Sequence, residues 1–187
     1  MRSGWGEGND DSDGDKPIDK KTYKGKQKIG DETPRLNIDG SVNSGAYNCH
    51  SFTFHNSMGD PSDPGNAEPL ADGYPKWDSS PMDDLEGWIP LPFDAPNEVG
   101  DRLIYFMWDE KSQMVKETHS AVVKTVDKEG NTIIVTSKWG WNALYDHHPR
   151  DISNSYGTTT APTFTAPDGN TYFSRVYFRK NNKIKLK

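Results

Sequence analysis

The chain has 187 residues, a length that fits one domain of ordinary size. Hydrophobic residues make up 32% of it and aromatic residues 11%, so a core requires that the apolar residues be concentrated in part of the sequence. The formal net charge of −6 argues against nucleic acid as a partner, because phosphate binding needs a basic surface. The sequence also lacks the apolar run of about 20 residues that a membrane-spanning helix requires.

The first 35 residues are rich in Gly, Asp and Lys and show no apolar periodicity. This composition predicts a disordered or loosely ordered acidic and polar tail over residues 1–35, followed by a single domain over 36–187. No signal-peptide pattern follows Met1, and the acidic start is similar in composition to the tether of some bacterial surface lipoproteins. We leave the compartment open and favour a secreted location or the bacterial cell envelope.

The stretch "AYNCHSFTFH" at residues 46–55 contains the only cysteine, Cys49. A lone thiol is an inert core residue, an intermolecular cross-link, a metal ligand or a nucleophile. Phe52 and Phe54 alternate as in a strand, but Asn48 is a good N-cap and favours a helix that begins at Cys49. A thiol at a helix N-terminus has a lowered pKa, which favours the reactive thiolate.

A proline-rich insertion follows at residues 59–100, where eight of the thirteen prolines lie. Proline fixes φ and lacks an N–H donor, so regular structure cannot extend far in this segment. Its aromatic residues, Trp88 and Phe93 among them, indicate that it packs over a surface. We expect it to form a wall of the substrate cleft.

Four strands are expected after the insertion, each dense in Val, Ile, Phe or Tyr. Their predicted ranges are 101–108, 118–126, 132–137 and 171–179. A turn with Gly130 joins the second strand to the third as a hairpin. Residues 138–170 are expected to be mostly irregular. One helix followed by antiparallel strands predicts an α+β domain.

A cysteine nucleophile needs a base, and His119 is the best candidate among the five histidines. It opens the apolar stretch "HSAVV", where a side chain at a strand end can face a cleft. His50 is adjacent to Cys49, but on a helix the next residue points away. The alternative is that His119 only tops its strand and bonds a neighbour.

The order of these motifs resembles the papain-like fold of NlpC-type and CHAP-type cell-wall hydrolases. The similarity covers about residues 45–180: a cysteine on a helix, then "GDRLIYF" with Gly100 and Asp101, then "THSAVV" with His119, then "TIIVTS". The later run from "SKWG" to "YFR" is similar to a variant of this fold in bacterial effector proteins.

The resemblance implies a Cys-bearing helix packed on an antiparallel β-sheet, and a cysteine amidohydrolase or peptidase without cofactor. Cys49 would attack an amide carbonyl of a peptide or a peptidoglycan stem peptide, with His119 as base and acid. We expect such a protein to be a monomer. The same residues would also serve a transglutaminase-like or deamidase-like reaction.

This chain departs from the family pattern at two places. NlpC members show Asp-Cys-Ser-Gly at the nucleophile, where this chain has Asn48-Cys49-His50-Ser51. CHAP members place an acid or Asn on the strand after the histidine strand, and the corresponding position here is about Ser137. The candidates for orienting the His119 ring are Ser137, His147 and Asp146.

Other polar and aromatic residues have secondary roles in this interpretation. Beside the Cys49 backbone N–H, the oxyanion donor would be Tyr47 or Asn48. Trp139 and Trp141 either pack beside the cleft or contact substrate. The segment "DHHP" (146–149) could bind zinc together with other histidines, but the chain has neither an HExxH spacing nor a second cysteine, so no metal is expected.

Two further classes of function stay open beside the hydrolase. One is a binding module on the same fold that has lost catalysis and recognises cell-wall or peptide ligands. The other is a surface structural protein in which Cys49 is a buried core residue.

Overall fold

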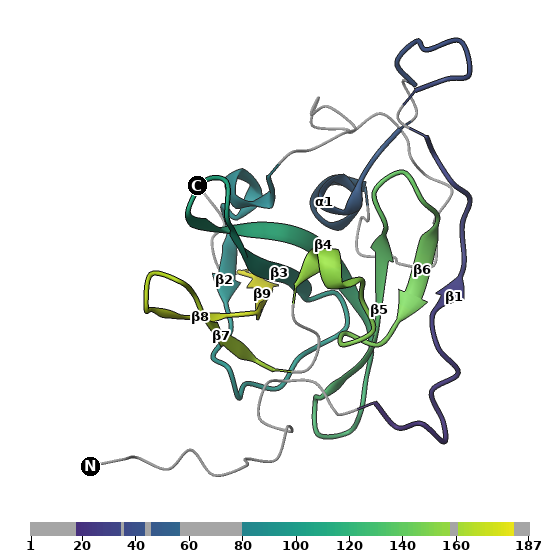
Figure 1. The fold of residues 1–187 in the computed structure, drawn as a ribbon. Coiled ribbons are helices and arrows are strands. Elements are labelled where there is room, and N and C mark those ends of the chain that lie inside the picture. Colours follow the sequence, from purple (N-terminus) through teal and green to yellow (C-terminus); the bar gives the residue numbers. More distant parts are fainter. Residues whose placement is uncertain (1–17, 35, 44–45, 57–79, 158–160, 182–187) are drawn as a thin grey trace, which may run out of the picture.

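The computed structural model describes residues 18–34, 36–43, 46–56, 80–157 and 161–181, and its main element is a seven-stranded antiparallel sheet. The strand order is β1-β6-β5-β4-β3-β9-β2 (Figure 1). The strands span β1 Gln27–Lys28, β2 Trp88–Pro90, β3 Arg102–Asp109, β4 Met114–Val126, β5 Thr132–Lys138, β6 Leu144–His147 and β9 Arg175–Lys180. A separate hairpin contains β7 Thr163–Thr165 and β8 Thr171–Phe173.

The helical elements are short. They are α1 Cys49–Ser51, its π-helical continuation η1 Phe52–Asn56, and the 3-10 turns η2 Pro81–Asp84 and η3 Asn154–Tyr156. In the described part of the chain, no helix has the length and apolar character needed to cross a membrane. The fold is therefore an α+β arrangement of one helical segment and a large antiparallel sheet, in agreement with the predicted class.

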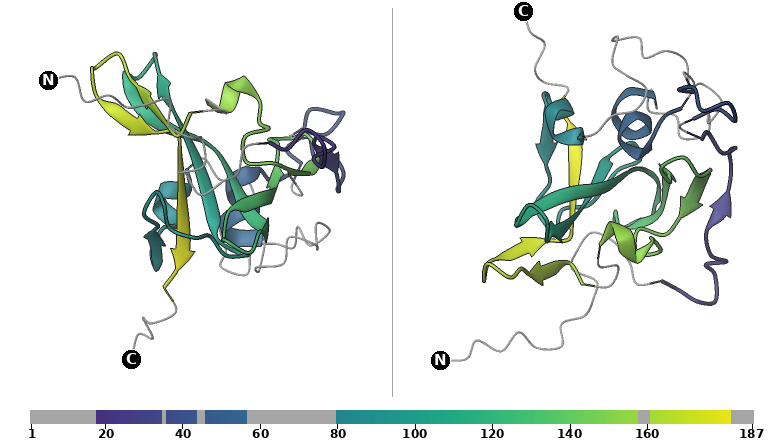
Figure 2. Two further views of the ribbon diagram at one scale, coloured as in Figure 1. Left: turned by 90° about the horizontal axis from the view of Figure 1, so that it is seen from below. Right: turned by 45° about the horizontal axis from the view of Figure 1, so that its top comes forward.

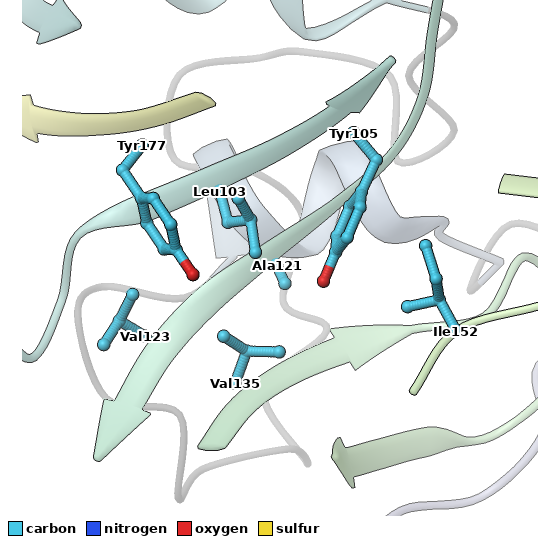
Figure 3. Packing of buried hydrophobic residues seen from close by; sticks show 7 residues of the cluster. All are labelled: Leu103, Tyr105, Ala121, Val123, Val135, Ile152 and Tyr177. Carbon is cyan, nitrogen blue, oxygen red and sulfur yellow. The ribbon is translucent and has the colours of Figure 1, made fainter. Parts of the chain in front are cut away.

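The two faces of the sheet carry different apolar clusters, because side chains alternate along a strand. One cluster has its seven buried members on the central strands and the loop before η3 (Figure 3): Leu103, Tyr105, Ala121, Val123, Val135, Ile152 and Tyr177. The other contains Tyr47, Phe52, Val122 and Leu144, and joins α1 to the sheet. The views in Figures 1 and 2 show α1 packed on this second face.

The predicted helix start at Cys49 is confirmed. The side-chain oxygen of Asn48 accepts a hydrogen bond from the Ser51 backbone N–H at 3.0 Å, which satisfies one of the donors that a helix start leaves open. After one α-helical turn the backbone widens into the π-helical turn η1.

The first three predicted strands are present as β3, β4 and β5, and β4 begins earlier, at Met114. The prediction of a fourth strand over residues 171–179 was wrong, because this segment is not one continuous strand. It divides at Ser174, whose carbonyl accepts from the Phe106 N–H and whose own N–H donates to the Pro162 carbonyl. As a result β8 pairs with β7, while β9 pairs with β3 and β2.

Short strands also occur where irregular structure was expected. The segment 138–170 contains β6 and β7, and the proline-rich insertion contains β2, which pairs with β9. In the expected tail, β1 pairs with β6 at the edge of the sheet. Residues 1–17 of the expected tail and 59–79 of the insertion lie outside the described residues.

The Gly-Asp pair that precedes β3 has a structural role. Gly100 has a φ of +93°, a conformation that favours glycine. The buried Asp101 carboxylate accepts two hydrogen bonds from the Arg179 guanidinium, at 2.9 and 2.7 Å, and one from the Glu98 N–H at 2.7 Å. Asp101 thereby ties the start of β3 to β9.

Candidate active site

Cys49 is the first residue of α1, and only 5% of its surface is exposed. Its neighbours in the chain are fixed by hydrogen bonds on both sides: Asn48 caps the helix, and His50 Nδ1 lies 2.8 Å from the Ser120 hydroxyl on β4. His50 therefore faces β4 of the sheet. The thiol is held at a defined place beside β4.

His119 of β4 is fully buried and interacts with the Cys49 thiol. Burial lowers the pKa of His119, whereas the charge of Cys49 and hydrogen bonding to its thiol act in the opposite direction. His119 Nδ1 has no well-aligned hydrogen-bond partner among the described residues. The thiol is thus a close neighbour without ideal geometry, which is common in catalytic pairs before substrate binds.

The other ring nitrogen of His119 is held by Ser137. The distance from His119 Nε2 to Ser137 Oγ is 3.0 Å, and from Ser137 Oγ to His147 Nε2 it is 2.7 Å. His147 Nδ1 in turn lies 2.8 Å from the His148 carbonyl oxygen. The structure therefore brings together four of the predicted residues in the order Cys49, His119, Ser137, His147.

The protonation states follow from this chain of contacts. The His148 carbonyl can only accept, so His147 Nδ1 carries a proton. Burial lowers the pKa of His147 to about 4, although the His148 carbonyl and Asp151 raise it, so the ring is neutral at pH 7. Its Nε2 must then accept the Ser137 hydroxyl proton.

Ser137 Oγ is left as an acceptor toward its other neighbours. It accepts from the Trp139 indole N–H at 3.0 Å, and it can accept from His119 Nε2–H. Neutral His119 then carries its proton on Nε2, and its Nδ1 has a free lone pair for the proton of Cys49. This is the tautomer that a general base for the thiol requires.

Two aromatic rings pack against the His119 ring. Tyr156 of η3 stacks on His119 with ring centroids 4.2 Å apart and an interplanar angle of 10°, and Trp139 meets His119 edge-on at 6.1 Å. Burial raises the pKa of Tyr156 to about 12, with a smaller contribution from the charge of Cys49. No role was predicted for Tyr156, because stacking across distant segments leaves no local sequence pattern.

The remaining predicted residues lie elsewhere or have other partners. Asp146 does not orient His119, because its carboxylate accepts from Lys124 and from the Thr136 hydroxyl. The Asn48 side-chain oxygen accepts the helix-cap hydrogen bond, so a role as oxyanion donor would fall to its amide nitrogen. Tyr47 is buried in the cluster between α1 and the sheet. Trp141 is 58% exposed.

The other histidines do not gather into a metal site. His55 Nε2 lies 2.9 Å from the buried Asp84 carboxylate, and the backbone N–H of Arg150 donates to His148 Nδ1. Within the described ranges, no group of three or more His, Cys, Asp or Glu side chains is arranged to hold a metal ion.

Comparisons with protein-family models, with curated proteins and with solved structures gave no match to this chain.

Proposed function

We propose that this chain is a cysteine amidohydrolase with a papain-like arrangement of nucleophile and base, and that it cleaves an amide bond in a peptide. Peptidoglycan stem peptides are the substrate class implied by the resemblance to NlpC-type and CHAP-type enzymes. The observation that supports the proposal is the Cys49–His119 pair, in which the base is held by Ser137 through Nε2 and has its Nδ1 lone pair available.

The reaction uses this pair twice. His119 Nδ1 takes the Cys49 proton, and the thiolate attacks the substrate carbonyl to form a tetrahedral oxyanion near the N–H groups at the start of α1. The protonated His119 then gives its proton to the leaving amine as the C–N bond breaks, which leaves a thioester on Cys49. A water molecule, deprotonated by His119, attacks the thioester and releases the carboxylic acid and the thiol.

The first test needs no substrate. The rate of iodoacetamide alkylation of folded protein would be measured from pH 5 to 9 for wild type, His119→Ala and the control His55→Gln. We expect wild type to react well below the ordinary thiol pKa of about 8.5, and His119→Ala to shift the profile toward that value. His55→Gln should match wild type, because the contact of His55 with Asp84 is separate from the hydrogen-bonded chain of His119, Ser137 and His147.

An ordinary thiol titration in wild type that is unchanged by His119→Ala would overturn the proposal. A thiol that reacts only after unfolding would instead make Cys49 a core residue.

The binding-module alternative is supported by a separate observation. A cavity of about 350 Å³ lies beside β2 and β9 and is lined mainly by apolar side chains, among them Leu91, Phe93, Phe173 and Tyr177. Binding of peptidoglycan fragments that is lost on Phe93→Ala but retained in Cys49→Ala, in a protein with an ordinary thiol, would favour this function.

A further inference from the structure

The rings of Trp139 and Tyr145 form an aromatic corner that holds a cation of the chain itself. The two ring centroids are 5.5 Å apart, and the ring planes are inclined by 62°. The Lys26 ammonium lies 3.6 Å from the centroid of Trp139 and 4.5 Å from that of Tyr145. Both distances are inside the range of about 6 Å over which the face of an aromatic ring attracts a cation.

The aromatic corner adjoins the hydrogen-bonded residues of the candidate active site. The Trp139 ring meets the rings of His119 and His147 edge-on, with centroids 6.1 and 5.6 Å apart. Its indole N–H donates to Ser137, which holds His119 through Nε2. One aromatic ring therefore separates the Lys26 ammonium from the base, and a ligand cation in the same place would lie equally close to it.

The contacts of Lys26 show that the two rings are what attracts its ammonium. Lys26 is exposed, and in the described part of the chain its ammonium contacts the rings without a carboxylate partner. A bland explanation is that Lys26 anchors the N-terminal segment to the sheet. That segment is already held by the pairing of β1 with β6 (Figure 1) and by the hydrogen bond from the Ile29 N–H to the Leu144 carbonyl at 2.9 Å. The Lys26 side chain can therefore leave the rings while the backbone stays in place.

We propose that the aromatic corner of Trp139 and Tyr145 is a binding site for a primary ammonium group of the substrate, and that Lys26 occupies this site until substrate binds. The inference rests on the proposed function, since it treats the ligand as a substrate.

The proposal narrows the substrate class to peptides that carry a lysine-type side chain near the scissile amide. Lys26 is then an intramolecular competitor, which a substrate ammonium must displace. Trp139 has both of the roles that the sequence left open, because it packs beside the base and contacts the substrate cation.

The test measures binding of the peptide acetyl-Gly-Lys-Gly-amide and of a matched peptide whose lysine is acetylated on Nζ, which removes the charge. Binding to the full chain is followed by the NMR shift of the Trp139 indole N–H in wild type, Lys26→Met and Lys24→Met. Methionine keeps most of the side-chain length without the charge. Lys24 is the matched control, because it is an exposed lysine of the same segment and, within the described residues, its ammonium contacts neither ring.

We expect Lys26→Met to bind the lysine peptide about fivefold more tightly than wild type, because the competing ammonium is gone. Lys24→Met should match wild type, and the acetylated peptide should leave the Trp139 resonance unchanged. Equal affinities in wild type and Lys26→Met overturn the inference. An equal gain in Lys24→Met, or equal binding of the two peptides, overturns it as well.

A measurement on wild type covers the case in which Lys26→Met does not fold. The protons on Lys26 Cε lie close to the aromatic faces, so their NMR resonance is shifted by the rings. The lysine peptide should move this resonance toward the value of a solvated lysine, and the acetylated peptide should not. A Lys26 resonance that stays unchanged overturns the inference. A thiol profile insensitive to His119→Ala would instead refute the proposed function, because peptide binding at the aromatic corner does not depend on the reactivity of Cys49.

Discussion

Ser137 accepts a hydrogen bond from the His119 ring, although a serine hydroxyl can also donate. Its direction is fixed by the residue behind it: neutral His147 takes the hydroxyl proton and leaves the oxygen free to accept from His119 and Trp139. The Ser137–His147 pair thereby holds the His119 ring through Nε2. The arrangement depends on His147 being neutral.

The neutrality of His147 predicts a pH-dependent stability. The pKa of His147 is about 4 in the folded protein, against an ordinary value of 6.5. Between these values the unfolded chain binds the proton and the folded chain does not, so stability falls as the pH drops from about 6.5 toward 4. We expect the free energy of unfolding to be about 2 kcal/mol lower at pH 5 than at pH 7 from this residue.

Urea unfolding of wild type and His147→Gln at pH 5 and pH 7 checks this predicted loss of stability. His147→Gln should lose less stability between pH 7 and pH 5 than wild type. The loss of stability that remains in the variant should come mainly from His119, whose pKa burial also lowers. Equal losses in both proteins would mean that His147 does not resist protonation in the folded state.

At the scale of elements, the N-terminal segment supports the site from outside. β1 pairs with β6, and the Lys26 ammonium lies 3.6 Å from the centroid of the Trp139 ring, whose indole holds Ser137. Tyr23 donates from its hydroxyl to Asp151 at 2.6 Å and accepts from the His148 N–H at 3.1 Å. This segment therefore fixes the loop whose His148 carbonyl sets the His147 tautomer.

The variant Tyr23→Phe tests whether the N-terminal segment stabilises the loop that carries His148. The partly buried hydroxyl bridges two groups, and its loss should lower the free energy of unfolding by about 1–2 kcal/mol and speed exchange of the His148 amide proton. The matched control is Tyr172→Phe, which removes an exposed hydrogen bond to Asp168 of the same 2.6 Å length and should leave the free energy of unfolding nearly unchanged. Equal costs for the two variants would contradict the supporting role of the segment.

The elements that the sequence predicted are those with strong local signals. Asn48 marks the helix start because capping is a local interaction, and β3, β4 and β5 are rich in alternating or continuous apolar residues. The strands β1, β2 and β6 have two to four residues and exist through pairing with distant partners. The division of the last predicted strand at Ser174 likewise depends on Pro162 and Phe106, which lie in other segments.

At the scale of the whole molecule, the candidate site is assembled from α1 and the neighbouring strands β4, β5 and β6. The local contexts of Cys49 and His119 in the sequence led to both candidates, and the structure places the two side chains next to each other. The roles of Ser137 and His147 depend on the β5–β6 register, in which Val135 is opposite His147 and Ser137 is opposite Tyr145. Such a register follows from tertiary pairing, so the sequence left three candidates for orienting the base.

Asp101 follows Gly100 at the start of β3, and its carboxylate is bound to Arg179 of β9. Asp101→Asn should lower the free energy of unfolding by about 2 kcal/mol, between the values typical of exposed and buried pairs, because Asp101 is 3% exposed and Arg179 32%. The thiol pKa of Cys49 should not change, because the ion pair holds β3 against β9 and is separate from the hydrogen-bonded chain of His119, Ser137 and His147.

Glu98→Gln is the matched control for this prediction, since Glu98 contacts the same guanidinium at 3.0 Å but is 69% exposed. Its cost should be below about 0.5 kcal/mol. Chemical denaturation gives the stabilities, and the iodoacetamide profile gives the thiol pKa on the same samples. A thiol pKa that rises in Asp101→Asn while the stability is unchanged would reverse the assignment, because the carboxylate would then act on the site and not on the sheet.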